Sequence, residues 1–149
     1  MYDSSYDTYA HKEIVQKLMT NYVIPELSRR AIEHDDTKLS SPEKECYDKY
    51  IPMLKNAKYG SDEYEDIRQR MSEEGLEHHY SSNRHHPEHF ENGINDMTVI
   101  DLVEMIIDWI AASQRSDTGF LKGLETNAQK YGIPTMLKDI IANTYQDMQ

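Results

Sequence analysis

Histidine is concentrated in one short stretch of this sequence. Five of the seven histidines fall between His78 and His89, in the run HHYSSNRHHPEHF. The run is internal and is interrupted by Asn83, Arg84 and Pro87, so it does not have the form of a purification tag. Imidazole nitrogens are common ligands for zinc, iron, manganese and nickel ions in proteins. The run therefore indicates a metal site.

Other imidazole and carboxylate groups stand outside this run. His11 lies near the start of an expected helix, the pair His34-Asp35 ends the next one, and Asp108 lies much later on an apolar helix. A histidine, an adjacent His-Asp pair and a distant aspartate together provide a ligand set for one divalent ion. Histidines between the pair and the last aspartate could hold a second ion, with Asp35 bridging the two.

The spacing of apolar residues predicts the elements that must position these groups. No segment alternates convincingly with a period of two, and only six glycines and five prolines occur in 149 residues. The pattern predicts an all-α fold of six or seven helices in one domain over residues 1–149, with a polar tail at 1–8. Pro25 is expected to interrupt the first helical segment and restart the chain. The expected helices cover residues 9–22, 25–34, 41–55, 60–80, 98–113, 117–131 and 134–145.

The helix expected over residues 98–113 has the clearest apolar face, formed by Ile100, Val103, Ile107, Ile110 and Ala111. Asp101, Glu104 and Asp108 are spaced three and four residues apart on the same helix, so they share a face. Burying several carboxylates is costly unless a cation or a donor compensates. Two interpretations stay open: a solvated face, or a ligand face on which Asp108 lies nearer the buried edge.

Composition excludes several classes of protein. The formal net charge of −11 argues against non-specific binding to nucleic acid or anionic membrane, and it suits a bound cation. Cys46 is the only cysteine, which excludes a disulfide framework and a cysteine-rich zinc site. No apolar run approaches the roughly 18 residues that suggest a membrane span. The N-terminal MYDSSYDTYA lacks the pattern of a signal peptide, so the sequence predicts a cytoplasmic protein.

The order His11, His34-Asp35 and Asp108 resembles that of the HD-domain superfamily of metal-dependent phosphohydrolases. The segment HDDTK, which ends at Lys38, is similar to the His-Asp-x-Gly-Lys box of many HD proteins, with threonine in place of glycine. More closely, HHYSSNRHHPEHF and DLVEMIIDW resemble an uncharacterised family of small HD-like proteins of phages and bacteria. That likeness extends over nearly the whole chain.

The insert HHPE, from His85 to Glu88, looks like that of two-metal HD subfamilies. Cyclic-dinucleotide phosphodiesterases of the HD-GYP type carry a similar His-His-Glu, but the Gly-Tyr-Pro that names them is absent, so we do not assign that activity. Neighbouring helical residues point about 100° apart, so only one of His78 and His79 should face the site. The resemblance favours His79, although the choice stays open. The implied metal ligands are His11, His34, Asp35, His79, His85, His86 and Asp108.

The resemblance implies an HD-like helical bundle that hydrolyses a nucleotide phosphoester, either a deoxynucleotide or a cyclic nucleotide. One or two divalent ions (Mn, Fe, Ni, Co, Mg or Zn) would activate the water. Lys38 and Glu104 are the catalytic candidates, and Arg84 and Asn83 are the substrate-binding candidates. The alternative for the two cations is ordinary surface charge.

Two other functions remain open at this point. The same order of ligands also occurs in HD-fold di-iron oxygenases, and a non-catalytic, metal-stabilised protein that binds a partner would need the same ligands. The resemblance places the protein in the cytoplasm of a bacterium or a phage-infected cell. HD proteins often dimerise, so the resemblance also implies a homo-oligomer.

Overall fold

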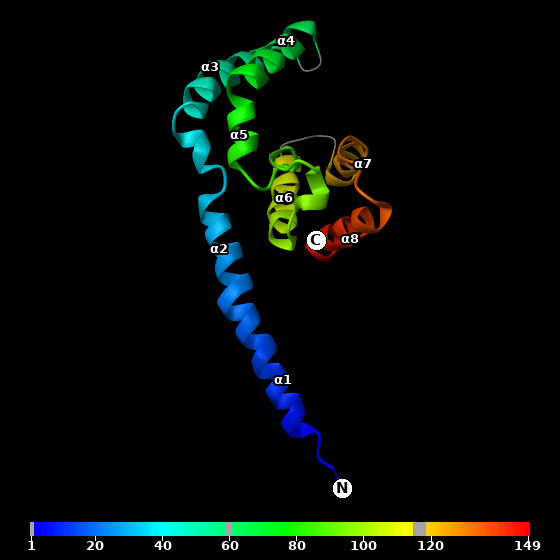
Figure 1. Ribbon diagram of the computed structural model, residues 1–149. Coiled ribbons are helices and arrows are strands. Elements are labelled where there is room, and N and C mark those ends of the chain that lie inside the picture. Colours follow the sequence, from blue (N-terminus) through cyan, green and yellow to red (C-terminus); the bar gives the residue numbers. More distant parts are fainter. Residues whose placement is uncertain (1, 59–60, 115–118) are drawn as a thin grey trace. The chain divides into compact units, whose positions relative to one another are not determined.

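The computed structural model describes residues 2–58, 61–114 and 119–149, which form helices joined by short turns, without a strand (Figure 1). The all-α prediction is therefore confirmed. Contacts divide the chain into two units, Met1–His34 and Asp35–Gln149. Among the described residues, no helix has the length and apolar character needed to cross a membrane.

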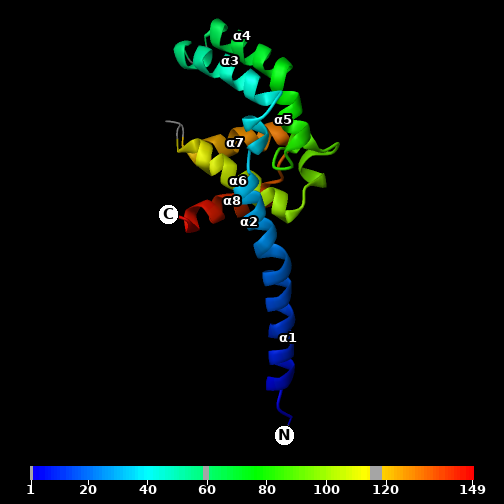
Figure 2. The ribbon, with the colours of Figure 1, turned by 90° about the vertical axis from the view of Figure 1, so that its left-hand side faces the viewer.

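Helices follow one another along the described part of the chain (Figures 1 and 2). The first residues of the helices predicted over 60–80 and 117–131 lie outside the described residues. The α-helices are α1 (Ser5–Leu18), α2 (Ile24–Glu33), α3 (Glu43–Asn56), α4 (Asp62–Met71), α5 (Glu77–Ser82), α6 (Val99–Ser113), α7 (Phe120–Tyr131) and α8 (Thr135–Asp147). Shorter turns are the π-helical η1 (Met19–Val23) and η3 (Ser72–Leu76) and the 3-10 η2 (Asp36–Leu39), η4 (Pro87–His89) and η5 (Gly93–Asp96).

In the first unit, α1 continues through the π turn η1 into α2. The predicted interruption at Pro25 is therefore wrong. Proline lacks the N–H of the helical ladder and its ring crowds a carbonyl one turn earlier, and the wider π turn accommodates both effects. The helix also begins at Ser5, inside the predicted tail, where the Asp3 carboxylate accepts a hydrogen bond from the Ser5 N–H at 2.9 Å.

The second unit contains two clusters of buried apolar side chains. One cluster lies among α6, α7 and α8 and includes Met105, Phe120 and Ile141. The other lies among α3, α4 and η3 and includes Cys46 and Tyr50. In the chain, α5 and the histidine-rich segment connect the helices of these two clusters (Figure 1). The histidine-rich segment is therefore anchored at both ends by packed helices.

The buried face of α6 differs from the predicted one. Ile100 and Ile110 are buried as expected, but Ile107 is exposed, and Met105 and Ile106 are buried. Ile94 and Met97, in the segment before α6, pack against the apolar cluster together with α7 and α8. The side chains of α6 therefore meet more than one neighbouring element. A helix that is apolar over most of its circumference has no single face for its periodicity to identify.

Gly75 lies in the π turn η3, where the backbone passes close to α3. A Cβ atom at Gly75 would stand 2.5 Å from Sγ and 2.7 Å from Cβ of Cys46. Cys46 is itself buried in the apolar cluster of α3 and α4, so its side chain has little room to move. The close approach of η3 to α3 therefore requires glycine at this position.

Gly75→Ala is expected to lower the free energy of unfolding by about 1–3 kcal/mol, the usual cost of overpacking an interior. Urea unfolding followed by circular dichroism measures the change. Gly123→Ala on α7 is the matched control, because a Cβ atom there meets no other atom within 4 Å. This control should gain roughly 0.5–1 kcal/mol, since alanine favours a helix over glycine. Equal stability of the two variants would contradict the predicted clash.

Candidate metal centre

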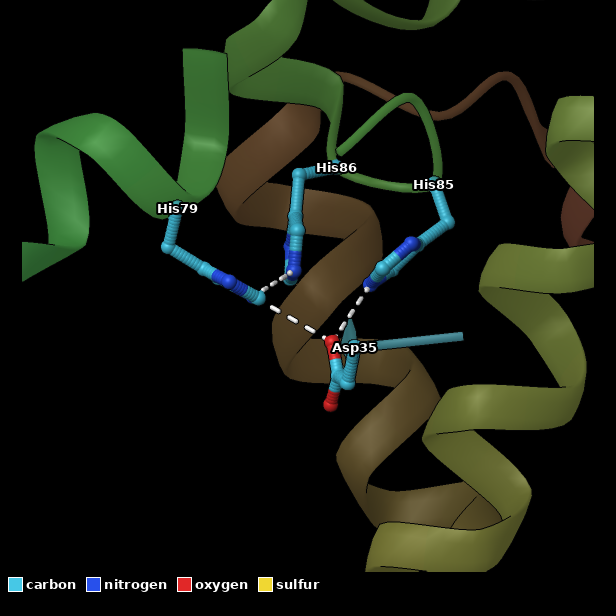
Figure 3. A group of neighbouring side chains, drawn as sticks. All are labelled: Asp35, His79, His85 and His86. Atoms are coloured by element: carbon cyan, nitrogen blue, oxygen red, sulfur yellow. Dashed lines mark hydrogen bonds and ion pairs between the residues drawn. The ribbon is translucent and has the colours of Figure 1, made fainter. Parts of the chain in front are cut away.

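Three histidine rings and one aspartate converge in the second unit (Figure 3). One nitrogen or oxygen atom from each of Asp35, His79, His85 and His86 lies within 4.8 Å of the others. Asp35 directly precedes η2, His79 belongs to α5, and the other two histidines lie in the loop after α5. In Figure 3 the rings point toward the Asp35 carboxylate. We call these four residues the donor group.

Short distances join the atoms of the donor group. Nε2 of His79 lies 2.8 Å from Nε2 of His86, and Oδ1 of Asp35 lies 3.5 Å from Nε2 of both His79 and His85. Two neutral ring nitrogens repel each other at such a distance if both present lone pairs. Either one of them carries an N–H that the other accepts, or a cation binds both lone pairs. Metal–nitrogen bonds of about 2.0–2.1 Å place neighbouring ligands roughly 3 Å apart. The spacing therefore fits one bound ion.

A sharp backbone turn at Asp35 places its carboxylate in the donor group. Asp35 has φ 61° and ψ 13°, and among the described residues it is the one non-glycine residue with positive φ. Aspartate tolerates this left-handed conformation better than most residues, and residues held there cluster at functional sites. Thr37 takes the place of the glycine in the box to which the sequence HDDTK is similar. It lies in the 3-10 turn η2 and therefore needs no left-handed conformation.

Backbone hydrogen bonds shape the loop that carries His85 and His86. The His86 N–H donates to the Asn83 carbonyl at 3.2 Å, and the His89 N–H donates to the His86 carbonyl at 3.0 Å. Pro87 begins the 3-10 turn η4, where its fixed φ fits and its missing N–H costs little. These turns hold the loop against α5, so the rings of His85 and His86 meet the ring of His79.

Burial holds the rings of His79 and His86 in the neutral form. His79 and His85 are each 2% exposed. Burial, followed by the neighbouring His85 and His79 rings, lowers the pKa of His86 to about 3. Burial also lowers the pKa of His79. Neutral imidazole is the form that ligates a metal ion, so the rings of His79 and His86 are in a ligating state near neutral pH.

The chemistry of the donor group suits a transition-metal ion. Three imidazoles and one carboxylate are a suitable set for zinc, iron, cobalt, nickel or manganese. The set fits magnesium less well, because that ion prefers oxygen ligands and keeps several waters. The formal net charge of −11 also favours a bound cation. The donor group could therefore hold a metal ion.

A family model described as a family of unknown function, DUF5662, matches residues 1–147 of the chain. The chain belongs to this family. No curated protein and no solved structure matches it. The family has no assigned activity, so only the residues of the site indicate a function.

In this DUF5662 chain, His79 rather than His78 joins the donor group. Nδ1 of His78 instead lies 2.7 Å from Oε1 of Glu43, and the His78 side chain is 44% exposed. The two neighbours on α5 thus point in different directions, as expected from the helical twist. The geometry selects His79 from the pair that the sequence left open.

Glu104 and Lys38 both contact residues of the donor group. Oε1 of Glu104 lies 3.1 Å from Nδ1 of His85, and Nζ of Lys38 lies 2.5 Å from Oδ2 of Asp35. Asp108 follows one turn after Glu104 on α6, and its charge acts on the nearby ring of His86. Asp108 lies outside the donor group, and its role as a ligand stays a prediction.

Asn83 and Arg84 take part in polar networks around the donor group. Nδ2 of Asn83 donates to Oγ1 of Thr37 at 2.9 Å and to the carbonyl of His79 at 2.7 Å. Arg84 donates through Nε and Nη2 to the two carboxylate oxygens of Asp101, at 3.1 and 2.9 Å. Both residues therefore order the surroundings of the site, and substrate binding by either stays a prediction.

Asp101 is fully buried, so the interpretation of its carboxylate as part of a solvated face is wrong. Its Oδ2 accepts a hydrogen bond from the Thr98 N–H at 2.8 Å, while its own N–H donates to Oγ1 of Thr98 at 3.2 Å. These bonds form a capping box at the start of α6. The spacing of threonine and aspartate could have indicated this cap, but the bond to Arg84 requires the tertiary structure.

His11 and His34 belong to the first unit. His11 lies on the exposed surface of α1, and His34 is the C-cap of α2, directly before Asp35 in the chain. Their roles as metal ligands stay predictions.

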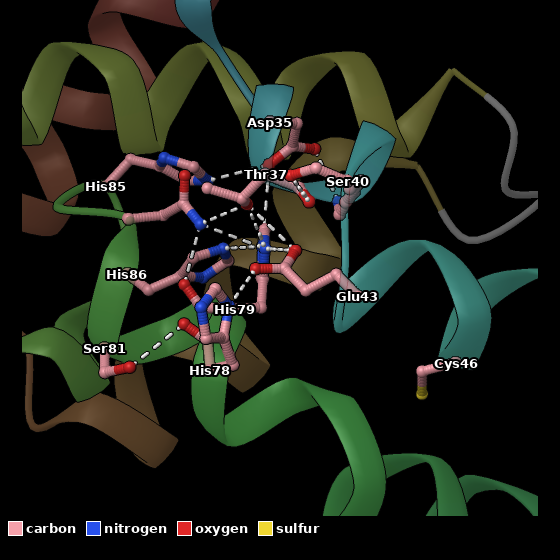
Figure 4. Close-up of polar contacts among 12 residues, drawn as sticks. Asp35, Thr37, Ser40, Glu43, Cys46, His78, His79, Ser81, His85 and His86 are labelled. Carbon is pink, nitrogen blue, oxygen red and sulfur yellow. Dashed lines mark hydrogen bonds and ion pairs between the residues drawn. The ribbon is translucent and has the colours of Figure 1, made fainter.

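Glu43, at the start of α3, is the residue of this site that sequence reasoning missed. Its carboxylate is fully buried and accepts hydrogen bonds from the rings of His78 and His79, at 2.7 and 2.9 Å (Figure 4). Burial opposes ionisation, but hydrogen bonds from His78 and then Thr37 keep the pKa of Glu43 below its usual value. An acidic residue in the first turn of a helix is common, so no local signal distinguishes this one.

Proposed function

We propose that this chain is a metal-dependent phosphohydrolase that acts on a nucleotide phosphoester. The observation that carries the proposal is the buried donor group of Asp35, His79, His85 and His86, with the cationic Lys38 beside it. The resemblance of HDDTK and of the histidine run to HD phosphohydrolases supports the same activity. The proposed substrate class is a deoxynucleotide or a cyclic nucleotide.

One or two divalent ions would be held by the donor group, with His11, His34 and Asp108 as further candidate ligands. Such an ion supplies hydroxide near neutral pH by lowering the pKa of a water, and it polarises a phosphoryl oxygen. The contribution of the protein is to hold its ligand atoms in place and to keep bulk water away. The burial of His79 and His85 serves both purposes.

Lys38 and Glu104 flank the donor group with opposite charges. The Lys38 side chain remains partly exposed, so its ammonium group can meet an anion from solvent. In a chain with a formal net charge of −11, a local cation is needed to attract a phosphate. Glu104 orients the His85 ring through Nδ1 and is the candidate acceptor for a proton from water.

Lys38→Ala is expected to lower kcat/KM for phosphoester hydrolysis by roughly 10- to 100-fold, because a hydrogen bond to a charged group contributes about 1.5–3 kcal/mol. Steady-state kinetics on the best substrate measures the change. Lys44→Ala is the matched control, since Lys44 pairs with Asp48 on the exposed surface of α3. The control should retain its kinetics. If both lysine variants behaved alike, Lys38 would have no part in binding phosphate.

A panel of deoxynucleoside mono- and triphosphates and cyclic nucleotides tests the proposed function. Each is incubated with Mn²⁺, Co²⁺, Ni²⁺, Fe²⁺, Zn²⁺ or Mg²⁺, and phosphate release and products are measured. We expect turnover with at least one transition metal. A chain that is fully loaded with metal and cleaves none of them would overturn the proposal. Two irons per chain with charge-transfer bands would instead indicate the di-iron oxygenase.

A further inference from the structure

We infer that Glu43 is a positioning residue of the metal centre, whose carboxylate holds the His79 ring as the tautomer with a proton on Nδ1. The unprotonated Nε2 of that ring then faces the other donors. The inference rests on the metal site of the proposed function and adds a residue that neither the HD resemblance nor the family match assigns.

Glu43 brings three separate donors to one carboxylate (Figure 4). Its Oε2 accepts from Nδ1 of His79 and from Oγ1 of Thr37, both at 2.9 Å. Its Oε1 accepts from Nδ1 of His78 at 2.7 Å. The side chain is fully buried, so these protein groups take the place of water around its charge.

The direction of each hydrogen bond follows from the protons that are available. The side-chain amide of Asn83 has two protons, and they go to Oγ1 of Thr37 and to the carbonyl of His79. Thr37 accepts from Asn83, so its own hydroxyl proton goes to Glu43. An ionised carboxylate can only accept, so the Nδ1 atom of His79 must supply the proton of its bond to Glu43.

Asn83 also lies close to Nδ1 of His79, at 3.1 Å. That contact does not compete with Glu43, because both amide protons of Asn83 already have other acceptors. A ring with its proton on Nδ1 presents a lone pair at Nε2. The Nε2 atom of His79 is the atom that lies 2.8 Å from His86 and 3.5 Å from Asp35.

Glu43 thereby orients the His79 ring in the same way as Glu104 orients the His85 ring. The two carboxylates lie on α3 and α6, which belong to the two different apolar clusters of the second unit. Each contacts the Nδ1 atom of one ring, at 2.9 and 3.1 Å. Carboxylates in this position orient a ligating ring and raise its basicity. The donor group is thus held by both parts of the core.

Glu43→Leu tests the inference, because leucine fills a similar volume but has no acceptor for the proton on Nδ1 of His79. Two measurements are made on full-length protein without nucleotide: ¹⁵N NMR of the histidine rings, and the affinity for Co²⁺ by competition with a chelator. In the parent chain we expect the His79 signal of an Nδ1–H tautomer. In Glu43→Leu this signal should be lost, and the affinity for Co²⁺ should fall by roughly 10- to 100-fold.

His78→Ala is the matched control. It removes the hydrogen bond to Oε1 and leaves the bonds of Thr37 and His79 to Oε2. The control should keep the His79 tautomer and the parent affinity for Co²⁺. Thr37→Val is a second test variant in case Glu43→Leu does not fold, and it should move both measurements in the same direction by a smaller amount.

Parent-like NMR and affinity in Glu43→Leu, or an equal loss of affinity in His78→Ala, would overturn the role of Glu43. Parent-like values in Thr37→Val would do the same if it is the only test variant that folds. Neither measurement uses a phosphoester. An absence of hydrolysis in the parent chain would therefore reject the proposed function while leaving the positioning of His79 by Glu43 to be judged on its own data.

Discussion

Asp35→Asn is expected to weaken the binding of Co²⁺ or Zn²⁺ by more than about 100-fold. Loss of a group that only orients a ligand typically weakens metal binding by about 10- to 100-fold. Asp35 supplies the only carboxylate of the donor group, whose other members are imidazoles. Burial keeps the imidazoles of His79 and His86 neutral. Loss of the Asp35 carboxylate removes both a ligand and the main electrostatic attraction for the cation. Phosphoester hydrolysis should fall with metal occupancy.

Asparagine is the informative replacement because it tolerates the left-handed backbone that Asp35 adopts, at φ 61°. Alanine would add backbone strain to the loss of the ligand. Chelator competition measures the affinity, and the metal-dependent rise in melting temperature gives an independent check. Asp48→Asn, at an exposed ion pair on α3, is the control and should bind metal as the parent does. Parent-like binding by Asp35→Asn would place the metal elsewhere.

Asp101→Ala is expected to lower the free energy of unfolding by about 2–4 kcal/mol, the largest loss of stability that we predict. The change removes the capping box of α6 and leaves Arg84 without the carboxylate that binds its Nε and Nη2. The fully buried position of Asp101 makes the loss large. The partly exposed Arg84 side chain keeps the loss below that of a wholly buried pair, because water can still solvate it.

Urea unfolding of Asp101→Ala, Arg84→Ala and the double variant measures this loss and its coupling. Asp139→Ala, at an exposed site on α8, is the control and should change stability by less than about 0.5 kcal/mol. The two single losses should not add, because both remove the same hydrogen bonds. An Arg84→Ala variant of full stability that loses hydrolysis would show instead that Arg84 binds substrate.

Much of the fold followed from the sequence, because helices depend on local spacing and local signals. The helices predicted over 98–113 and 134–145 correspond to α6 and α8. Gly132 ends α7 in the left-handed conformation that favours glycine, and Pro134 directly precedes α8. The prediction at Pro25 was wrong because proline occurs both where a helix ends and where a helix widens into a π turn. The sequence does not distinguish these two cases.

The chemistry of the site was also determined by the sequence, but its geometry was not. The histidines and the His-Asp pair indicate metal ligands by residue type alone. Because five of the seven histidines lie in one run, the sequence also indicates which segment carries these ligands. Which of two adjacent histidines faces Asp35 depends on how α5 is rotated against its neighbours. That rotation is decided by packing, and it selects His79.

The carboxylates around the rings depended still more on the tertiary structure. The sequence singled out Glu104 because it stands one turn before Asp108 on an apolar helix. Glu43 stands in the ordinary segment EKEC, and its histidine partners lie 35 and 36 residues away. Local composition determined which residues could bind a metal. Only the packing of distant helices decided which carboxylates are buried and must therefore be satisfied by those rings.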